Sequence, residues 1–140
     1  MPQVVIRFNE QLPHAPMDHP RWEDLERQIA VIVATALNVE GSASFKLHPD
    51  DVEVFIEPIL ERRSYLDRNA APITILVTAN KCPERVANLT ERNDQIIDGV
   101  LEYSWALAEV LLQPDMPPTG KSRKLLGVWT QLVDGAYATR

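Results

Sequence analysis

Residues 73–79 read Ile73-Thr74-Ile75-Leu76-Val77-Thr78-Ala79, and this stretch decides the fold class. The run is almost wholly apolar, and most of its residues are β-formers. A continuous apolar run of this length is typical of a strand that is buried on both faces. We therefore expect a strand here that lies in the middle of a sheet.

Working outward, the sequence has three more strand patterns and two helical ones. Strands are expected at residues 2–8, 51–57 and 125–133, because these runs are rich in β-formers and the second closes at Pro58. Between the first two, one apolar stripe predicts a helix that begins at Pro20 and ends near residues 38–41. The stripe consists of Trp22, Leu25, Ile29, Ile32, Val33 and Ala36.

A second helical pattern opens at Pro83 and continues to Leu111. Asn93 stands where the apolar stripe calls for an apolar residue, and Gly99 follows it. The pattern therefore fits either one long helix or two shorter helices with a break.

The resulting order is strand, helix, strand, strand, helix, strand. It predicts an α/β (α+β) domain over residues 1–140, made of tandem βαβ units, with a four-stranded sheet and two helices on one face. The pseudo-repeats would cover about residues 1–70 and 71–140. A ferredoxin-like sandwich has the same element order, so order alone does not choose the fold.

Composition narrows the function classes. The 140 residues carry a net charge of −6, which argues against a nucleic-acid or anionic-membrane partner. Cys82 is the only cysteine, so an intramolecular disulfide and a thiolate metal cluster are excluded. The start lacks a secretory signal pattern, and the apolar run 29–37 is too short for a membrane span. We expect a cytoplasmic protein.

The segment Met1-Pro2-Gln3-Val4-Val5-Ile6 resembles the opening of the tautomerase superfamily, of the 4-oxalocrotonate tautomerase and 5-carboxymethyl-2-hydroxymuconate isomerase type. In that family a proline follows the initiator methionine and a short apolar strand continues from it. Residues 36–39 leading to 51–56 resemble the end of the family's first helix and its second strand. Residues 72–77 resemble the start of a second, fused unit.

The resemblance implies a cofactor-free tautomerase or isomerase, usually a homotrimer, with Pro2 as general base. Removal of Met1 would expose a secondary amine, which in its neutral form can take a proton from a carbon next to a carbonyl group. An apolar pocket and nearby cations lower the pKa of such an amine below that of an ordinary α-amino group. The alternative is a purely structural role, in which Pro2 is a stiff residue at the start of a strand.

A small anionic organic substrate requires positive charge, which arginine supplies to carboxylates and enolates. Candidates for substrate binding are Arg7 at the end of the first strand, Arg62 and Arg63 in the following connector, and Lys46, with Trp129 as a possible pocket wall. The alternatives are a solvated loop for the arginines and core packing, the favoured reading, for Trp129. Three scattered histidines do not predict a metal site.

Glu53 departs from the family pattern, since the short tautomerases carry an arginine at the aligned place. A carboxylate there would repel an anionic substrate, but it can activate a water molecule, as acids do in the hydratase and dehalogenase branches. Its alternative role is a strand position that faces water. A competing function for the whole chain is a non-catalytic ligand-binding or assembly domain of ferredoxin-like or degenerate tautomerase fold.

Overall fold

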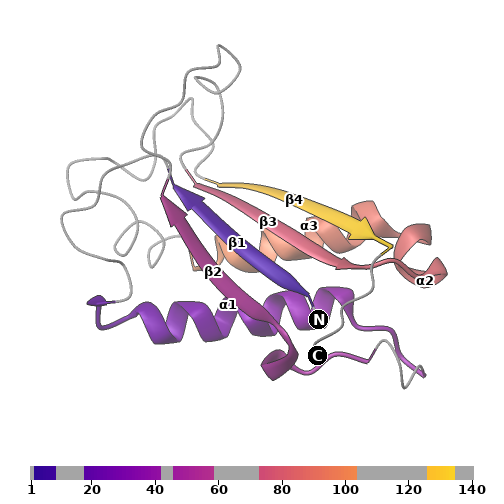
Figure 1. The fold of residues 1–140 in the computed structure, drawn as a ribbon, viewed down its shortest axis with the longest axis horizontal. Helices are drawn as coiled ribbons and strands as arrows, with labels where there is room; N and C mark the ends of the chain where they lie inside the picture. The colour runs from indigo at the N-terminus through magenta and orange to yellow at the C-terminus, as the bar shows by residue number, and fades with distance from the viewer. Residues whose placement is uncertain (1, 9–17, 42–45, 59–72, 104–125, 135–140) are drawn as a thin grey trace, which may run out of the picture.

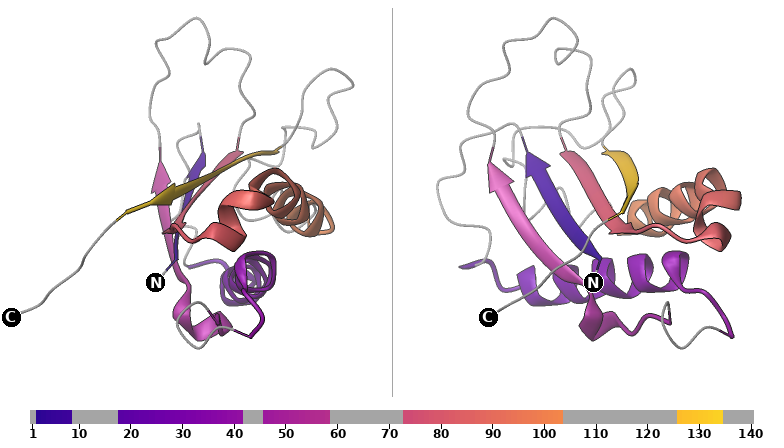
Figure 2. Two further views of the ribbon diagram at one scale, coloured as in Figure 1. Left: turned by 90° about the vertical axis from the view of Figure 1, so that its right-hand side faces the viewer. Right: turned by 45° about the vertical axis from the view of Figure 1, so that its right-hand side comes forward.

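The structure, a computed structural model, describes residues 2–8, 18–41, 46–58, 73–103 and 126–134. The strands are β1 (Gln3–Phe8), β2 (Glu53–Pro58), β3 (Ile73–Asn80) and β4 (Leu126–Val133). The helices are α1 (Trp22–Leu37), the short 3-10 helix η2 (Pro49–Asp51), α2 (Pro83–Ala87) and α3 (Leu89–Leu101). Helices α1, α2 and α3 lie on one face of a single sheet (Figures 1 and 2). The four-stranded sheet with its helices on one face confirms the predicted architecture.

The strand order is β2-β1-β3-β4, which joins two parallel pairs across an antiparallel centre. β1 pairs in parallel with β2, and β3 pairs in parallel with β4, while β1 and β3 run antiparallel. The predicted central position of residues 73–79 is confirmed, because β3 has a neighbour on each side. As a consequence, the start of β1 lies beside the end of β3.

The core lies between the sheet and the two longer helices. Alternate residues of the central strands, such as Val4, Ile6 and Ile75, are fully buried against the helix layer. From α1, the predicted stripe supplies Trp22 and Ile29 among other buried residues. The helix begins at Trp22 rather than at Pro20, because residues 20 and 21 form a turn ahead of it.

Helices α1 and α3 approach closely at one glycine. A Cβ atom built on Gly99 would lie 2.9 Å from Cγ2 of Ile32. Only a residue without a side chain leaves room for Ile32 at this crossing. Gly99 therefore has a packing role and does not break the helix.

The second helical pattern is two helices, and the break falls at Asn88. Asn88 has φ −135° and ψ 40°, which ends α2 before α3 begins. Asn93, which interrupts the apolar stripe, instead ties α3 to β4. Its side-chain amide donates to the carbonyl oxygen of Val128 over 3.2 Å, and its Oδ1 accepts a 2.7 Å bond from the hydroxyl of Thr130. Leu107 and Leu111 lie outside the described residues.

The second face of the sheet carries no helix among the described elements (Figure 2). The strand register arranges its side chains in three rows across the strands. One row is polar, consisting of Glu53, Gln3, Thr78 and Gln131. The middle row is apolar, consisting of Phe55, Val5, Leu76 and Trp129. A third row contains Glu57, Arg7, Thr74 and Gly127. We call this surface the open face. Within the described ranges, no helix is long and apolar enough to cross a bilayer.

Candidate active site

Pro2 is buried at the amino end of β1. It continues the series Val4, Ile6 and Phe8, whose side chains face the helix layer. Extending the strand register by one residue places Pro2 between Val52 and Ala79, which are both buried. The ring therefore has apolar neighbours on either side, the kind of surroundings that lower the pKa of an amine.

Arg85 of α2 is the buried cation nearest to this end of the sheet among the described residues, with 2% of its surface exposed. Its Nε donates to the carbonyl oxygen of Leu37 over 2.9 Å, and its Nη1 donates to that of Asn80 over 2.8 Å. Asn80 follows Ala79, the residue expected opposite Pro2. The guanidinium thus joins the end of α1 to the end of β3, the strand end that lies next to the start of β1.

Desolvation by burial lowers the pKa of the Arg85 guanidinium. Nearby Cys82 raises the pKa to a smaller extent, and the Arg92 cation lowers it further. Arginine nevertheless remains protonated at neutral pH, since its ordinary pKa lies far above neutrality. This end of the fold therefore holds a positive charge in surroundings where water screens it weakly.

Arg92 of α3 anchors the same end of α1. Its Nη1 donates to the carbonyl oxygens of Ala36 and Asn38, each over 2.9 Å, and its Nε donates to Oδ1 of Asn88 over 2.6 Å. The last carbonyls of a helix have no partner within the helix, and cations are favourable there because of the helix dipole. Arg85 and Arg92 together satisfy carbonyls of residues 36–38.

Glu53 is the first residue of β2, and its backbone N–H donates to the carbonyl oxygen of Pro2 over 3.1 Å. The two backbones are therefore adjacent. Their side chains point in opposite directions. Glu53 is in register with Gln3, the residue after Pro2, and both of these side chains lie in the polar row of the open face, whereas Pro2 faces the helix layer. The half-buried Glu53 carboxylate is thus separated from the Pro2 ring by the sheet.

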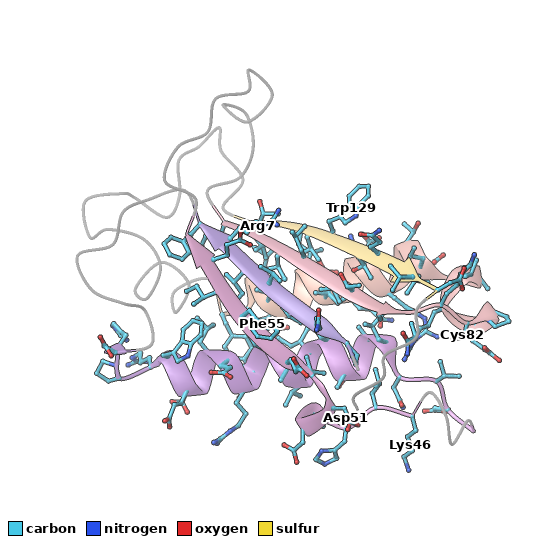
Figure 3. All side chains as sticks on the ribbon, in the orientation of Figure 1. Arg7, Lys46, Asp51, Phe55, Cys82 and Trp129 are labelled. Atoms are coloured by element: carbon cyan, nitrogen blue, oxygen red, sulfur yellow. The ribbon has the colours of Figure 1, made fainter. Side chains whose placement is uncertain are left out.

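Arg7 and Trp129 lie on the open face (Figure 3). Arg7 forms a 3.1 Å ion pair with Glu57, and both side chains are about half exposed. It is five residues along β1 from Pro2, or roughly 17 Å in an extended strand, so one chain does not bring the two together. Trp129 is 65% exposed, so the favoured reading of core packing is wrong. Trp129 faces away from the core because the odd-numbered residues of β4 from 127 to 131 belong to the open face.

Lys46 is exposed and points away from the sheet (Figure 3). It precedes Leu47, whose backbone N–H donates to Oδ1 of Asn38 over 2.9 Å. The segment of Lys46 is therefore fastened beside the end of α1, but the lysine itself meets neither Pro2 nor Arg7. Arg62 and Arg63 lie outside the described residues.

A groove of about 520 Å³ separates α1 from η2 and β2. Its walls are Glu23, Glu26, Arg27, Ala30, Pro49, Asp50, Val52 and Val54. Three carboxylates against one arginine make the groove a poor place for an anionic substrate, and none of the predicted site residues that the structure describes lines it. Within the described part of the chain, no group of three or more His, Cys, Asp and Glu side chains is arranged to hold a metal ion.

Sequence reasoning missed Arg85 and Arg92. A signal was available, because the two arginines are seven residues apart and Arg92 falls between Leu89 and Ile96 in the apolar stripe. A charged residue on an apolar helix face requires partners, since burial of an unpaired charge is costly. What the sequence does not reveal is that those partners are the carbonyls at the end of α1.

No protein-family model matches the chain, and no curated protein matches it in sequence. Solved structures do match in fold. A 5-carboxymethyl-2-hydroxymuconate delta-isomerase superimposes with a TM-score of 0.52 at 14% identity, over 100% of this chain and 87% of that one. The R7 fused 4-OT wild-type asymmetric trimer superimposes with a TM-score of 0.50 at 11% identity, over 94% of this chain and 85% of that one.

These matches extend over nearly the whole chain, including both strand-helix-strand units. At such low identity they establish the fold and leave activity open. They also decide between the two folds that share this element order. The chain has the fold of the tautomerase superfamily.

Proposed function

We propose that this chain is a cofactor-free tautomerase or isomerase that acts on a small anionic enol or keto acid, with the amine of Pro2 as general base. The proposal rests on one observation above all, the burial of Pro2 between Val52 and Ala79, at the end of β3 whose Asn80 carbonyl oxygen accepts a hydrogen bond from the buried Arg85. Apolar surroundings and a neighbouring cation both favour the neutral amine, the form that accepts a proton.

The reaction requires removal of Met1, because a proline nitrogen within the chain is an amide without basicity. The free amine takes a proton from the hydroxyl group of an enol or from a carbon next to a carbonyl group, and the ammonium then returns a proton at another carbon. No electron acceptor is needed, since only a proton and a double bond change place. The likeness in fold to a 5-carboxymethyl-2-hydroxymuconate delta-isomerase agrees with this chemistry.

We assign the positive charge that binds the substrate to Arg7, Arg62 and Arg63, with Lys46 as a further candidate and Trp129 as a pocket wall. Arg7 and Pro2 lie apart in one chain, so Arg7 can serve a Pro2 site only if a second subunit supplies it. We therefore propose a homotrimer. Two features support contacts between subunits, the edge strands β2 and β4 and the apolar row of the open face. The R7 fused 4-OT structure is itself a trimer.

A non-catalytic assembly domain is the competing function, and the exposure of Phe55 and Trp129 on the open face favours it. An extended apolar row suits subunit contact whether or not Pro2 reacts. Intact mass separates the two functions at the outset. Retention of Met1 would remove the amine and leave the assembly function.

The decisive experiment blocks the Pro2 nitrogen. The processed protein should accelerate ketonisation of a simple enol such as phenylenolpyruvate, with a base that titrates below the α-amino range. A form that keeps one residue ahead of Pro2 should fold and lose this activity. Its circular dichroism and its oligomeric mass serve as controls for folding. Equal rates for the blocked and processed forms would exclude Pro2 as the base.

A further inference from the structure

Two hydrogen bonds from the Arg85 guanidinium to backbone carbonyls, together with its burial, set it apart from an arginine that binds a substrate. Two of its nitrogens donate to Leu37 and Asn80, at the end of α1 and the end of β3. The residue is 2% exposed, so a ligand has little access to it. Its position nevertheless bears on Pro2, because the end of β3 is the neighbour of the start of β1 (Figure 2).

We infer that Arg85 is a positioning residue for Pro2: its buried guanidinium fixes the end of β3 beside the amine and holds there a positive charge that favours the neutral form. The inference rests on the proposed function, because it requires a free Pro2 amine. It adds a residue that tunes the base without touching the substrate.

The charge of Arg85 acts strongly because it is poorly solvated. Coulomb interactions in a protein interior are several times stronger than in water. The lowered pKa of the guanidinium has the same origin, since burial penalises its charged form. The two hydrogen bonds to carbonyl groups keep the group in place, so its field is fixed relative to the strand ends.

Other charged and titratable groups surround this end of the sheet. They are Asp51 and Glu53 at the start of β2, His48 ahead of η2, Lys81 and Cys82 after β3, Asp134 after β4, and Arg92 on α3. Cys82 is buried and adjacent to Arg85, whereas the rest are half-buried or exposed. Water screens the exposed charges, and Glu53 lies on the opposite side of the sheet. Arg85 is therefore expected to have the largest single effect.

The test measures the pKa of the Pro2 amine directly. Cyanate carbamylates neutral amines, so the pH dependence of its reaction with the processed protein reports that pKa, with peptide mass mapping to locate the label. Arg85→Gln removes the charge while its amide can still donate to one carbonyl oxygen. We expect the pKa of Pro2 to rise by about one in this variant. The acid limb of kcat/KM for an enol substrate should move by the same amount.

Arg92→Gln is the matched control. It removes the bonds to Ala36 and Asn38 at the same helix end but leaves Arg85 in place. Its effect on the pKa of Pro2 should be less than half that of Arg85→Gln. Equal shifts in the two variants, or an unchanged pKa in Arg85→Gln, would overturn the inference. Arg85→Lys keeps the charge and should restore most of the wild-type value.

A second route remains if Arg85→Gln does not fold. Arg92→Glu places a negative charge next to Arg85 from a half-buried position. Compared with Arg92→Gln, it should raise the pKa of Pro2, and identical values would overturn the inference. The cyanate titration does not depend on turnover. If Arg85→Gln shifts the pKa of Pro2 but the wild-type protein does not catalyse ketonisation, the proposed function is wrong and the inference about Arg85 stands. Retention of Met1 would refute both.

Discussion

The backbone N–H of Glu53 donates to the carbonyl oxygen of Pro2 over 3.1 Å, while the side chains of these two residues lie on opposite sides of the sheet. The backbones are as close as neighbouring strands allow. The Glu53 carboxylate is nevertheless directed to the open face, in the polar row with Gln3. Closeness of the Glu53 backbone to the candidate base is therefore no guide to the role of the Glu53 side chain.

This relationship predicts that the carboxylate is dispensable for proton transfer by Pro2. Glu53→Gln keeps the size of the side chain and the backbone hydrogen bond, so ketonisation of an enol should stay within about threefold of wild type. Addition of water to an acid with an activated double bond, if the protein catalyses it, should be lost, because activation of water requires the carboxylate as a base. Steady-state rates on both substrate types provide the measurement. Loss of ketonisation in Glu53→Gln would place the carboxylate at the proton-transfer step.

A separate prediction concerns the arginines assigned to the substrate. If Arg7, Arg62 or Arg63 binds an anionic group, its change to Ala should cost roughly 2–4 kcal/mol of transition-state binding, as loss of a charge partner does. Values of kcat/KM for the three single variants provide the measurement. Because Arg7 is paired with Glu57, Glu57→Ala is a useful control for loss of that ion pair alone. Changes within twofold for all three arginines would remove them from the mechanism.

The open face predicts how the subunits meet. Phe55 and Val86 are both 48% exposed, but Phe55 lies in the apolar row of the open face and Val86 lies on α2. Phe55→Glu should reduce the trimer to smaller species, because it buries an unpaired charge in the proposed contact. Val86→Glu should leave the assembly intact. Light scattering at micromolar protein measures both, and a wild-type mass of one chain would refute the trimer itself.

Packing at Gly99 predicts an overpacking penalty. Gly99→Ala places a Cβ 2.9 Å from Ile32, and the two helices must move apart or Ile32 must change its rotamer. The gain in helix propensity is about 1 kcal/mol, and overpacking costs about 1–3 kcal/mol, so the net loss should be up to about 2 kcal/mol. Urea unfolding measures it. In the Ile32→Ala background the same change should become neutral or stabilising, and a penalty of equal size there would locate the strain elsewhere.

Local patterns predicted most of the fold. The apolar run at residues 73–79 indicated the central strand, and the spacing of Trp22, Leu25 and Ile29 indicated α1, because burial on one side produces the periodicity of each element. The exact residues at which the helices begin and end were predicted less accurately. Helix α1 begins two residues after Pro20, and the second helical pattern breaks at Asn88, where no glycine or proline marks it.

The candidate site was less accessible from sequence, since its parts meet only in three dimensions. Pro2 was found because an amino-terminal proline is a local signal. Arg85 was missed because its partners, Leu37 and Asn80, are 48 and five residues away and are backbone atoms. For Trp129 the sequence offered a pocket wall and, as the favoured reading, core packing. A strand residue has two possible faces, and only the position of the helices shows which one is covered.

The strand order β2-β1-β3-β4 has a half-turn pseudosymmetry about its antiparallel centre, and this limits the chemistry of the fold. Rotation exchanges the pair β1 and β2 with the pair β3 and β4, so the end of the sheet that holds Pro2 has a geometric twin at the start of β3. The backbone nitrogens at the start of β3 are all amides, because that strand lies inside the chain. Two joined units of this kind can therefore carry an amine base at one end only. The residues around the start of β3 therefore have no part in proton transfer by an amine, and their sequence can differ from that around Pro2.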